Sequence, residues 1–255
     1  MSVALAGQRG LGYGAAPVPR TVVVIPTYNE RANIPRIVPE VLRALDDCHV
    51  LIVDDESPDG TADLVAELAK GEPRLHLVRH SPKMGIGPAY KEGFRVALEM
   101  QPDFIIQMDA DLSHPPEMLP KLVQLGGEYN LVLGSRYTNG ITVVNWPIGR
   151  LLLSYFGNYY VRKVLRLPVQ DATGGFKCWQ RATLEGIRPE RVRSNGYAFQ
   201  IETTYRAWRN RQSIREVPIL FVDRVEGDSK MNRRIGLEAL WIVWWLRLAG
   251  ALGRL

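Results

Sequence analysis

Two aspartates, Asp109 and Asp111, stand directly after a short apolar run, 104–108. Prolines bound the run on both sides, so it predicts a buried strand whose carboxyl end opens into a loop. Binding crevices of open α/β sheets lie at such strand ends. Carboxylate oxygens are hard ligands that suit Mg²⁺ or Mn²⁺, and these ions suit diphosphates. The pattern therefore favours a metal-diphosphate site, and the alternative is a solvated loop whose aspartates cap the following helix.

Two earlier apolar runs also end in acidic and turn residues. The segment 22–34 reads VVVIPTYNERANI, and the segment 51–61 reads LIVDDESPDGT. Three strand ends that carry carboxylates in one half of a chain are hard to explain by chance. Together they support a functional site more strongly than the aspartate pair does by itself.

At these segments the sequence resembles family 2 of the inverting glycosyltransferases with the GT-A fold, and within it the dolichol-phosphate and polyprenol-phosphate mannose synthases. The resemblance runs from Thr21 to about Lys230. The motifs that carry it are PTYNE (26–30), VDDESPDGT (53–61), MGIGPAYKEGF (84–94), MDADLSHPPE (108–117), GSRY (134–137), ATGGFKCW (172–179) and GDSKM (227–231). Their order and spacing agree with the family throughout.

The resemblance implies transfer of mannose from GDP-mannose to a polyprenyl (dolichyl-type) phosphate with inversion, to give polyprenyl β-D-mannosyl phosphate. A related transferase that uses UDP-glucose or another nucleotide sugar is the alternative, because no rule reads the base or the sugar from these motifs. A catalytically silent scaffold subunit at the membrane is a more distant alternative. Loss of the metal aspartate or of the downstream Arg/Lys loop would favour it, but both are present.

The resemblance assigns the first two strand ends to the donor nucleotide, where an aromatic ring can cover a base and a carboxylate can accept from base or ribose. The residues that it carries over there are Pro26, Tyr28, Glu30, Val53 and Asp55. The alternative is structural, with Asn29 capping a helix and Glu30 supporting its first turn. Asp54 and Asp59 fit turn and cap positions better, since SPDGT is also a plain turn sequence.

At the third strand end, the resemblance makes Asp111 the direct metal ligand and places Asp109 and the Ala110 backbone against the donor ribose and sugar. Some relatives carry Gln two residues after the second aspartate as another ligand. Here that position is Ser113, so a protein ligand there is in doubt and a water can take its place. His114 stands beside two prolines, and we expect it to pack or cap rather than to bind a metal.

Basic residues complete the expected site. Arg136 ends the fifth strand, and its rigid fork suits a phosphate. By resemblance Arg150 and Ser154, four residues apart on one helix face, also meet the acceptor phosphate. Arg224 and Lys230 flank a glycine-containing loop and carry over as contacts to the donor diphosphate. The expected catalytic set is Asp111, Arg136, Arg224 and Lys230.

The acceptor decides the mechanism that we expect. A hydroxyl acceptor needs a general base, but a phosphate monoester with a second pKa near ~6 is already an anionic nucleophile at neutral pH. The metal ion with Arg224 and Lys230 would stabilise charge on the departing diphosphate, while Arg136 and Arg150 would aim the attacking oxygen.

The elements that must position these residues alternate along the first half of the chain. Strand-like runs at 21–26, 50–53, 75–78, 104–108 and 131–134 are separated by helical patterns, which predicts a mostly parallel α/β sheet flanked by helices. In the second half, strands at 176–179 and 214–222 accompany helices at 145–167 and 194–210, so the sheet is expected to become mixed. The expected organisation is a disordered leader at 1–20, a GT-A domain at 21–230 and a C-terminal helix at 231–255.

The chain has 255 residues and a net charge of +5 that is unevenly distributed. Residues 1–144 carry 13 Lys and Arg against 18 Asp and Glu, whereas residues 145–255 carry 19 against 9. The basic half lacks a nucleic-acid-binding signature, so an anionic membrane surface or a phosphate-bearing acceptor is the better partner. Two cysteines fit buried thiols in a cytosolic compartment better than a disulfide framework.

Two segments are expected to lie on a membrane rather than cross it. The helix at about 146–167 mixes aromatic and basic residues, and the C-terminal segment has no uncharged run near the ~20 residues that a spanning helix needs. Trp241, Trp244 and Trp245 are expected to share one helical face and to anchor the protein peripherally on the cytoplasmic side, with Tyr155 and Tyr159. The alternatives are an ordinary buried helix and a membrane-protein partner.

Overall fold

A mixed β-sheet runs through the computed structural model, which describes residues 20–80, 85–222, 233–253 and 255, without the side chains of 233–240. Within these residues the sheet has seven strands in the order β3-β2-β1-β4-β7-β5-β8. Their bounds are β1 Thr21–Thr27, β2 Cys48–Asp54, β3 Leu75–Arg79, β4 Phe104–Gln107, β5 Leu131–Ser135, β7 Lys177–Gln180 and β8 Ile214–Pro218. A second, two-stranded sheet pairs β6 (Val143–Val144) with β9 (Phe221–Val222).

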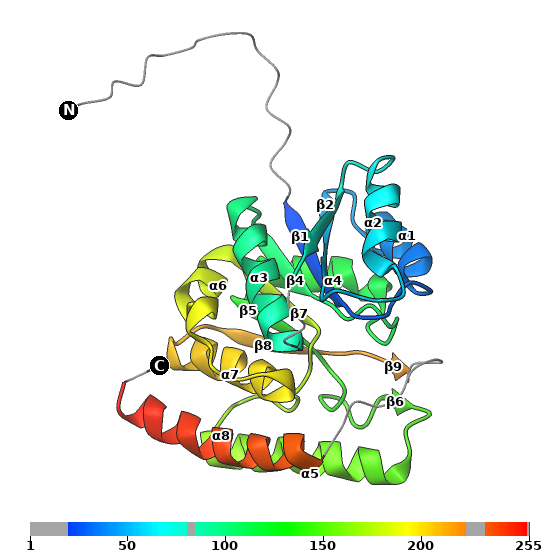
Figure 1. Ribbon diagram of the computed structural model, residues 1–255. Coiled ribbons are helices and arrows are strands. Elements are labelled where there is room, and N and C mark those ends of the chain that lie inside the picture. Colours follow the sequence, from blue (N-terminus) through cyan, green and yellow to red (C-terminus); the bar gives the residue numbers. More distant parts are fainter. Residues whose placement is uncertain (1–19, 81–84, 223–232, 254) are drawn as a thin grey trace, which may run out of the picture.

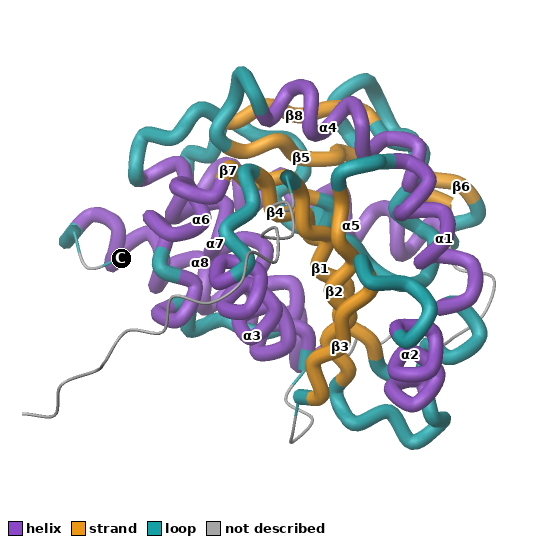
Figure 2. Tube along the Cα trace, turned by 90° about the horizontal axis from the view of Figure 1, so that it is seen from above, coloured by secondary structure: helices purple, strands orange, loops and turns teal. Residues whose placement is uncertain are grey.

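Helices cover both faces of the large sheet (Figures 1 and 2). On one face pack α1 (Ile34–Ala44), α2 (Thr61–Ala69) and α4 (Leu119–Gly126), and on the other pack α3 (Ile86–Glu99), α6 (Arg181–Ile187) and α7 (Gly196–Arg209). Short 3₁₀ turns lie at Pro116–Met118 and Pro189–Arg191. The continuous apolar run of β1 follows from this arrangement, because Val22 and Val24 enter one core while Val23 and Ile25 enter the other.

The sheet is parallel up to β4 and then changes. β7 lies between β4 and β5 and is antiparallel to both, while β5 and β8 are parallel to each other. The mostly parallel sheet that becomes mixed in the second half is thus confirmed.

The strand predicted over 214–222 is wrong in one respect, because the chain leaves the large sheet after Pro218. Proline has no N–H to extend the ladder. Pro218 forms the last pair with Ser135, and residues 221–222 join the small sheet instead.

Two long helices, α5 (Ile148–Leu165) and α8 (Arg233–Ala251), lie against each other across one end of the molecule (Figure 1). α8 also packs on α7, and its Val243 and Leu246 belong to the same core as the sheet. The predicted leader and the predicted boundary near residue 230 fall on residues 1–19 and 223–232, which lie outside the described residues. None of the described helices is both long and apolar enough to span a bilayer.

Candidate active site

The carboxyl ends of β1, β2 and β4 bring the predicted donor residues to one edge of the sheet. Pro26 and Val53 are direct partners in the β1-β2 register, and Thr27 pairs with Asp54. The Met108 N–H donates to the Val24 carbonyl at 3.1 Å, so the chain leaves β4 beside β1. The loops that carry Tyr28, Asp55 and Asp109 therefore start from adjacent strands.

Turn hydrogen bonds fasten the first two of these loops to each other. The Asp54 carboxylate is buried and accepts from the Thr27 hydroxyl at 2.8 Å and from the Ser57 N–H and hydroxyl at 2.9 and 2.6 Å. Asp59 accepts from the Thr61 N–H at 2.9 Å and from the Arg31 N–H at 3.1 Å. Both aspartates thus hold turns, as expected, but neither is the cap residue of α2, which is Gly60.

Hydrogen bonds from nearby residues hold the side chains of Asp55 and Glu30 in place. The Asp55 carboxylate is buried, lies 2.7 Å from the His80 Nδ1 and accepts from the Gly85 N–H at 3.2 Å. Glu30 accepts from the Asn33 side-chain amide at 2.7 Å. The proposed cap at Asn29 is excluded, because α1 starts at Ile34 and its cap position is Asn33. His80 was not among the predicted site residues, and its only signal in the sequence is its place at the end of β3.

At the third strand end, Asp109 is held from two sides. Its N–H donates to the His114 Nδ1 at 2.9 Å, and its Oδ1 accepts from the Tyr90 hydroxyl at 3.3 Å. His114 is buried and stacks on Phe176 with ring centroids 5.0 Å apart, so it packs as expected. Burial, then the nearby Asp109 carboxylate, raise the pKa of Tyr90 well above its usual value, so its phenol stays a donor.

Asp111 is fixed within its own turn. Its Oδ1 accepts from the Ser113 N–H at 3.1 Å and from the Ser113 hydroxyl at 2.6 Å. Between them, Leu112 has a φ of 61°, a left-handed conformation that is unusual for a branched residue. The turn thus holds the Asp111 carboxylate in a set orientation, and Ser113 is the residue that orients it.

The donor set fits a divalent ion held in an open site. Asp109 keeps 34% of its side chain exposed, and Asp111 is also partly exposed. Within the described residues no three His, Cys, Asp or Glu side chains gather into a closed cluster. Hard cations accept one or two protein carboxylates when phosphate and water oxygens complete the shell.

Arg136 lies at the end of β5 and is 7% exposed. Its Nε and Nη2 donate to the two Asp171 carboxylate oxygens at 2.7 and 2.5 Å, and Nη2 also donates to the Thr173 hydroxyl at 2.8 Å. Burial opposes the charge, but Asp171 more than offsets it and raises the pKa of Arg136. Burial by itself would raise the pKa of Asp171, but Arg136 outweighs this effect, and the pKa of Asp171 is lowered. Asp171 was not among the predicted site residues, although it directly precedes the ATGGFKCW motif.

Helix α5 is joined to the same region. The Tyr137 hydroxyl donates to the Ser154 hydroxyl at 2.7 Å. One turn further along, Asn158 donates to the Thr173 hydroxyl at 3.1 Å and accepts from the Thr173 N–H at 3.2 Å. Arg150, in the first turn of α5, lies over the Trp146 ring at 4.2 Å. The structure thus brings Arg136, Arg150 and Ser154 together, whereas Arg224 and Lys230 lie outside the described residues.

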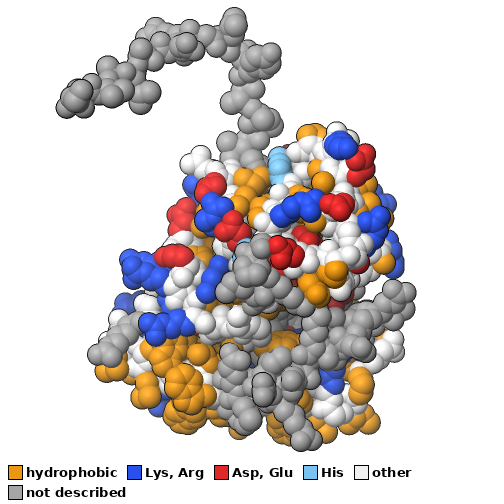
Figure 3. Space-filling view, viewed as in Figure 1, with side chains coloured by type: hydrophobic (Ala, Val, Ile, Leu, Met, Phe, Trp, Pro, Cys, Tyr) orange, Lys and Arg blue, Asp and Glu red, His pale blue; other side chains and the backbone are white. Residues whose placement is uncertain are grey.

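An apolar surface lies on α5 and α8. Figure 3 shows hydrophobic side chains gathered at the end of the molecule where Figure 1 places these helices. Its most exposed members are Ile148, Leu153 and Phe156 on α5 and Trp241, Trp244 and Leu248 on α8. The expected common face of three tryptophans needs correction, because Trp245 is partly buried on the core and lies under Arg193 at 5.4 Å.

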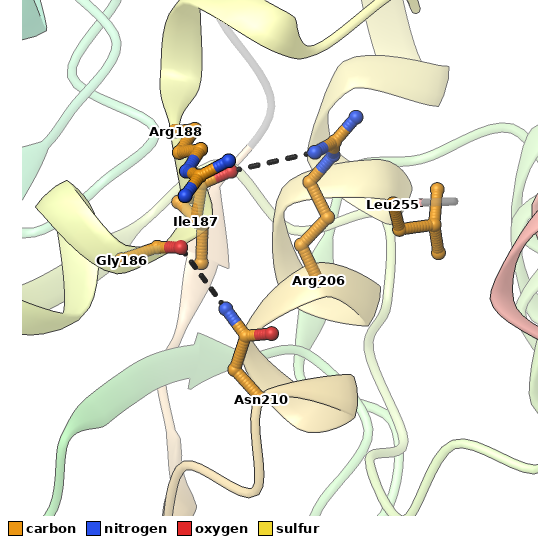
Figure 4. Close-up of a pocket in the computed structure, with 6 residues that line it drawn as sticks. All are labelled: Gly186, Ile187, Arg188, Arg206, Asn210 and Leu255. Atoms are coloured by element: carbon orange, nitrogen blue, oxygen red, sulfur yellow. Dashed lines mark hydrogen bonds between the residues drawn. The ribbon is translucent and has the colours of Figure 1, made fainter. Parts of the chain in front are cut away.

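A pocket of about 210 Å³ lies away from the carboxylates, between the ends of α6 and α7 (Figure 4). Asn210 donates to the Gly186 carbonyl at 3.0 Å across it. Arg206 lines the pocket, but its guanidinium is taken up by Glu202 and by the Arg191 carbonyl. The side-chain groups of Asn210 and Arg206 are therefore already used in hydrogen bonds within the protein.

Comparison with known proteins places the chain in one family. Residues 22–188, more than half of the chain, match the family model described as glycosyl transferase family 2. The polyprenol monophosphomannose synthase of Mycolicibacterium smegmatis is 44% identical over 97% of this chain and 96% of its own length. The undecaprenyl-phosphate mannosyltransferase of Micrococcus luteus is 41% identical over 87% of this chain and 91% of its own length.

Among solved structures, glucosyl-3-phosphoglycerate synthase from Mycobacterium tuberculosis, in complex with Mn²⁺ and UDP-glucose, has a TM-score of 0.62. It is 20% identical, over 92% of this chain and 79% of the other. At that identity the likeness shows the shared GT-A fold.

Proposed function

The chain belongs to glycosyl transferase family 2, and from this premise we propose that it transfers mannose from GDP-mannose to a polyprenyl phosphate with inversion. Two relatives at 41–44% identity, which act on polyprenol or undecaprenyl phosphate by name, support this reaction. The observation that carries the proposal is that the sheet edge that holds the carboxylates also holds Arg136, at the end of β5, and that Arg136 and Arg150 lie over the same Trp146 ring. The carboxylates suit a metal-bound diphosphate, and the arginines suit a phosphate acceptor.

On the donor side, the loops after β1 and β2 would hold the nucleotide through Pro26, Tyr28, Glu30, Val53 and Asp55. Asp109 and the Ala110 backbone would contact ribose and sugar. Asp111 would hold Mg²⁺ or Mn²⁺, and Ser113 would orient its carboxylate through the 2.6 Å hydrogen bond rather than bind the ion itself. When bound, the ion supplies positive charge to the leaving diphosphate.

On the acceptor side, three residues would meet the phosphate. Arg150 lies in the first turn of α5, where the helix end itself is partly positive and no acidic residue is present. Arg136 lies nearby, with its Nε and Nη2 directed to Asp171. Ser154 follows one turn later. Together these groups would receive the phosphate head of the acceptor and aim one of its oxygens at the sugar.

The phosphate itself would be the nucleophile, so no general base is needed. Glu202, the one acidic residue of α7, is consistent with this. It is fully buried, and its oxygens accept from the N–H groups of Arg193 and Ser194, from the Ser194 hydroxyl and from the Arg206 guanidinium. Such a saturated carboxylate cannot collect a proton from a substrate. Arg224 and Lys230 would neutralise the departing diphosphate.

The acceptor also gives the apolar surface of α5 and α8 a role. A lipid phosphate is tethered in a bilayer, so the enzyme must meet it at the surface. We place the exposed side chains of α5 and α8 at that surface, with Arg150 at headgroup depth, and the protein peripherally on the cytoplasmic side where a nucleotide sugar is available.

The proposal is tested with purified protein, a divalent ion, a short polyprenyl phosphate and a panel of labelled nucleotide sugars. We expect transfer from GDP-mannose, with UDP-glucose at least about a hundredfold poorer. A clear preference for UDP-glucose would replace the donor assignment. No transfer from any nucleotide sugar would favour a scaffold role.

A further inference from the structure

A buried chain of hydrogen bonds joins β7, β4 and α7 through their side chains. The Trp179 Nε1 donates to the Gln107 Oε1 at 2.7 Å, and the Gln107 Nε2 donates to the Gln200 Oε1 at 3.2 Å. Trp179 and Gln107 are fully buried, and Gln200 is 4% exposed. Gln107 is the last residue of β4, two residues before Asp109, so this chain lies close to the carboxylate edge of the sheet.

The chemistry of these groups fixes the direction of every bond in the chain. An indole N–H can only donate, so the Gln107 atom that meets it must be the amide oxygen. The amide nitrogen of Gln107 then faces Gln200, whose oxygen must accept. The Gln200 Nε2 is left as a donor, and within the described residues it makes no hydrogen bond. An unpaired donor on so buried a side chain is unfavourable, and a ligand that accepts from it would remove that cost.

The Gln200 Nε2 lies beside Gly175, two residues before β7. A Cβ built on Gly175 would lie 3.5 Å from the Gln200 Nε2 and 3.7 Å from the Asp109 Oδ1. It would lie 3.4 Å from the His114 Cε1. The three side chains therefore border one small space, which the glycine does not fill. An amide donor beside a carboxylate acceptor matches a hydroxyl group, because a hydroxyl can accept from the first and donate to the second.

We propose, on the basis of the proposed function, that Gln200 donates to a hydroxyl of the donor sugar and so helps to select that sugar. A phosphate is the poorer occupant, because its negative charge would lie against the Asp109 carboxylate. The Lys177 Nζ donates to the Gln200 carbonyl at 2.8 Å, so the backbone of Gln200 is held as well as its side-chain oxygen. A preorganised donor of this kind discriminates against a sugar that lacks the matching hydroxyl.

The test is calorimetry with GDP-mannose and with GDP, in the presence of Mg²⁺ and without a lipid acceptor. Gln200→Met removes the donor and adds no charge. It should weaken GDP-mannose about tenfold and GDP less than about twofold, because only the first ligand carries the sugar. Gln180→Met is the matched control, since the Gln180 Nε2 already donates to the Gly126 carbonyl at 2.8 Å. It should lower stability and leave both affinities unchanged.

Gly175→Ala tests the space itself and keeps Gln200. The new Cβ would make ordinary van der Waals contacts at 3.4–3.7 Å, and Gly175 is not among the glycines with positive φ, so the thermal midpoint should stay close to that of wild type. The added methyl group would occupy the space, so GDP-mannose should again weaken about tenfold while GDP does not. If either variant weakened GDP as much as GDP-mannose, or left GDP-mannose unaffected, the proposal would be overturned.

Analogues of GDP-mannose that each lack one sugar hydroxyl identify the group that Gln200 meets. One analogue should bind wild type about tenfold more weakly than GDP-mannose, but bind Gln200→Met as well as GDP-mannose does. Additive losses with every analogue would refute the contact. Wild-type protein that binds UDP-glucose but not GDP-mannose would refute the donor in the proposed function. Gln200→Met would then have to weaken UDP-glucose and not UDP, and equal affinities would refute the role of Gln200.

Discussion

The expected metal ligand at the donor end is oriented by hydrogen bonds inside its own turn, whereas the acceptor end depends on a buried ion pair between distant segments. Asp111 accepts from Ser113, two residues away. Arg136 instead meets Asp171 across 35 residues of chain, and Thr173 joins that pair to α5. Loss of Asp111 should therefore stay local, while loss of the Arg136–Asp171 pair should also lower the stability of the fold.

The largest expected effect is on the donor end. Asp111→Ala should lower kcat/KM by about a thousandfold or more, because it removes the carboxylate that would hold the metal ion, while the thermal midpoint should hardly change. Asp63→Ala, at an exposed site on α2, is the matched control. Transfer rates close to wild type in Asp111→Ala, with a divalent ion still required, would remove Asp111 from this role.

The acceptor end should respond differently. Asp171→Asn leaves the buried Arg136 charge without its carboxylate, so urea unfolding should show a loss of about 3–5 kcal/mol in addition to poorer use of the lipid phosphate. The double variant Arg136→Met with Asp171→Leu should recover most of the stability, because no buried charge is left, but none of the acceptor use. A stable Asp171→Asn protein that uses only the donor less well would contradict the contrast between the two ends.

The tryptophans of α8 should differ in what their replacement changes, membrane binding or stability. Trp241 and Trp244 are 70% and 55% exposed, so replacing both by Ser should weaken binding to vesicles with anionic lipid about tenfold or more. Trp245→Ser should lower stability instead, because that ring packs on the core. High salt should release only part of the wild-type protein, since apolar burial remains. If the wild-type protein did not bind such vesicles in a sedimentation assay, the proposal that this surface binds a membrane would be refuted.

The smallest effect concerns the amino edge of the sheet, away from both substrates. His49 and His76 stack with centroids 5.0 Å apart, and their ring nitrogens lie 2.7 Å apart. Burial, then the neighbouring His76, lower the pKa of His49, and burial lowers that of His76. The unfolded chain therefore takes up protons first as the pH falls through about 6.5, and stability decreases below that pH.

His76→Phe keeps a ring but not the second titrating group. Its thermal midpoint should fall less between pH 7.5 and 5.5 than that of wild type, and KM for both substrates at pH 7.5 should be unchanged. If the thermal midpoints of the two proteins fell equally between pH 7.5 and 5.5, the histidine pair would not be the cause of the pH dependence.

The two ends also differ in how far the sequence predicts them. Asp109, Asp111 and Asp55 follow apolar runs directly, so a linear pattern places them at one edge of the sheet, as found. Asp171 carries no such pattern, because its role arises only when β5, α5 and the segment before β7 meet. The same limit applies to the strand predicted over 214–222, where the pairing of β9 with β6 was decided by tertiary contacts.

The configuration of the product tests the central claim most directly. Protein, Mg²⁺, GDP-mannose labelled with ¹³C at the anomeric carbon and a short polyprenyl phosphate should yield a mannosyl phosphate whose one-bond carbon–hydrogen coupling, measured by NMR, reports a β linkage. A β-linked product is the result of in-line attack by the lipid phosphate. An α-linked product, or free mannose with the lipid phosphate unchanged, would contradict the account.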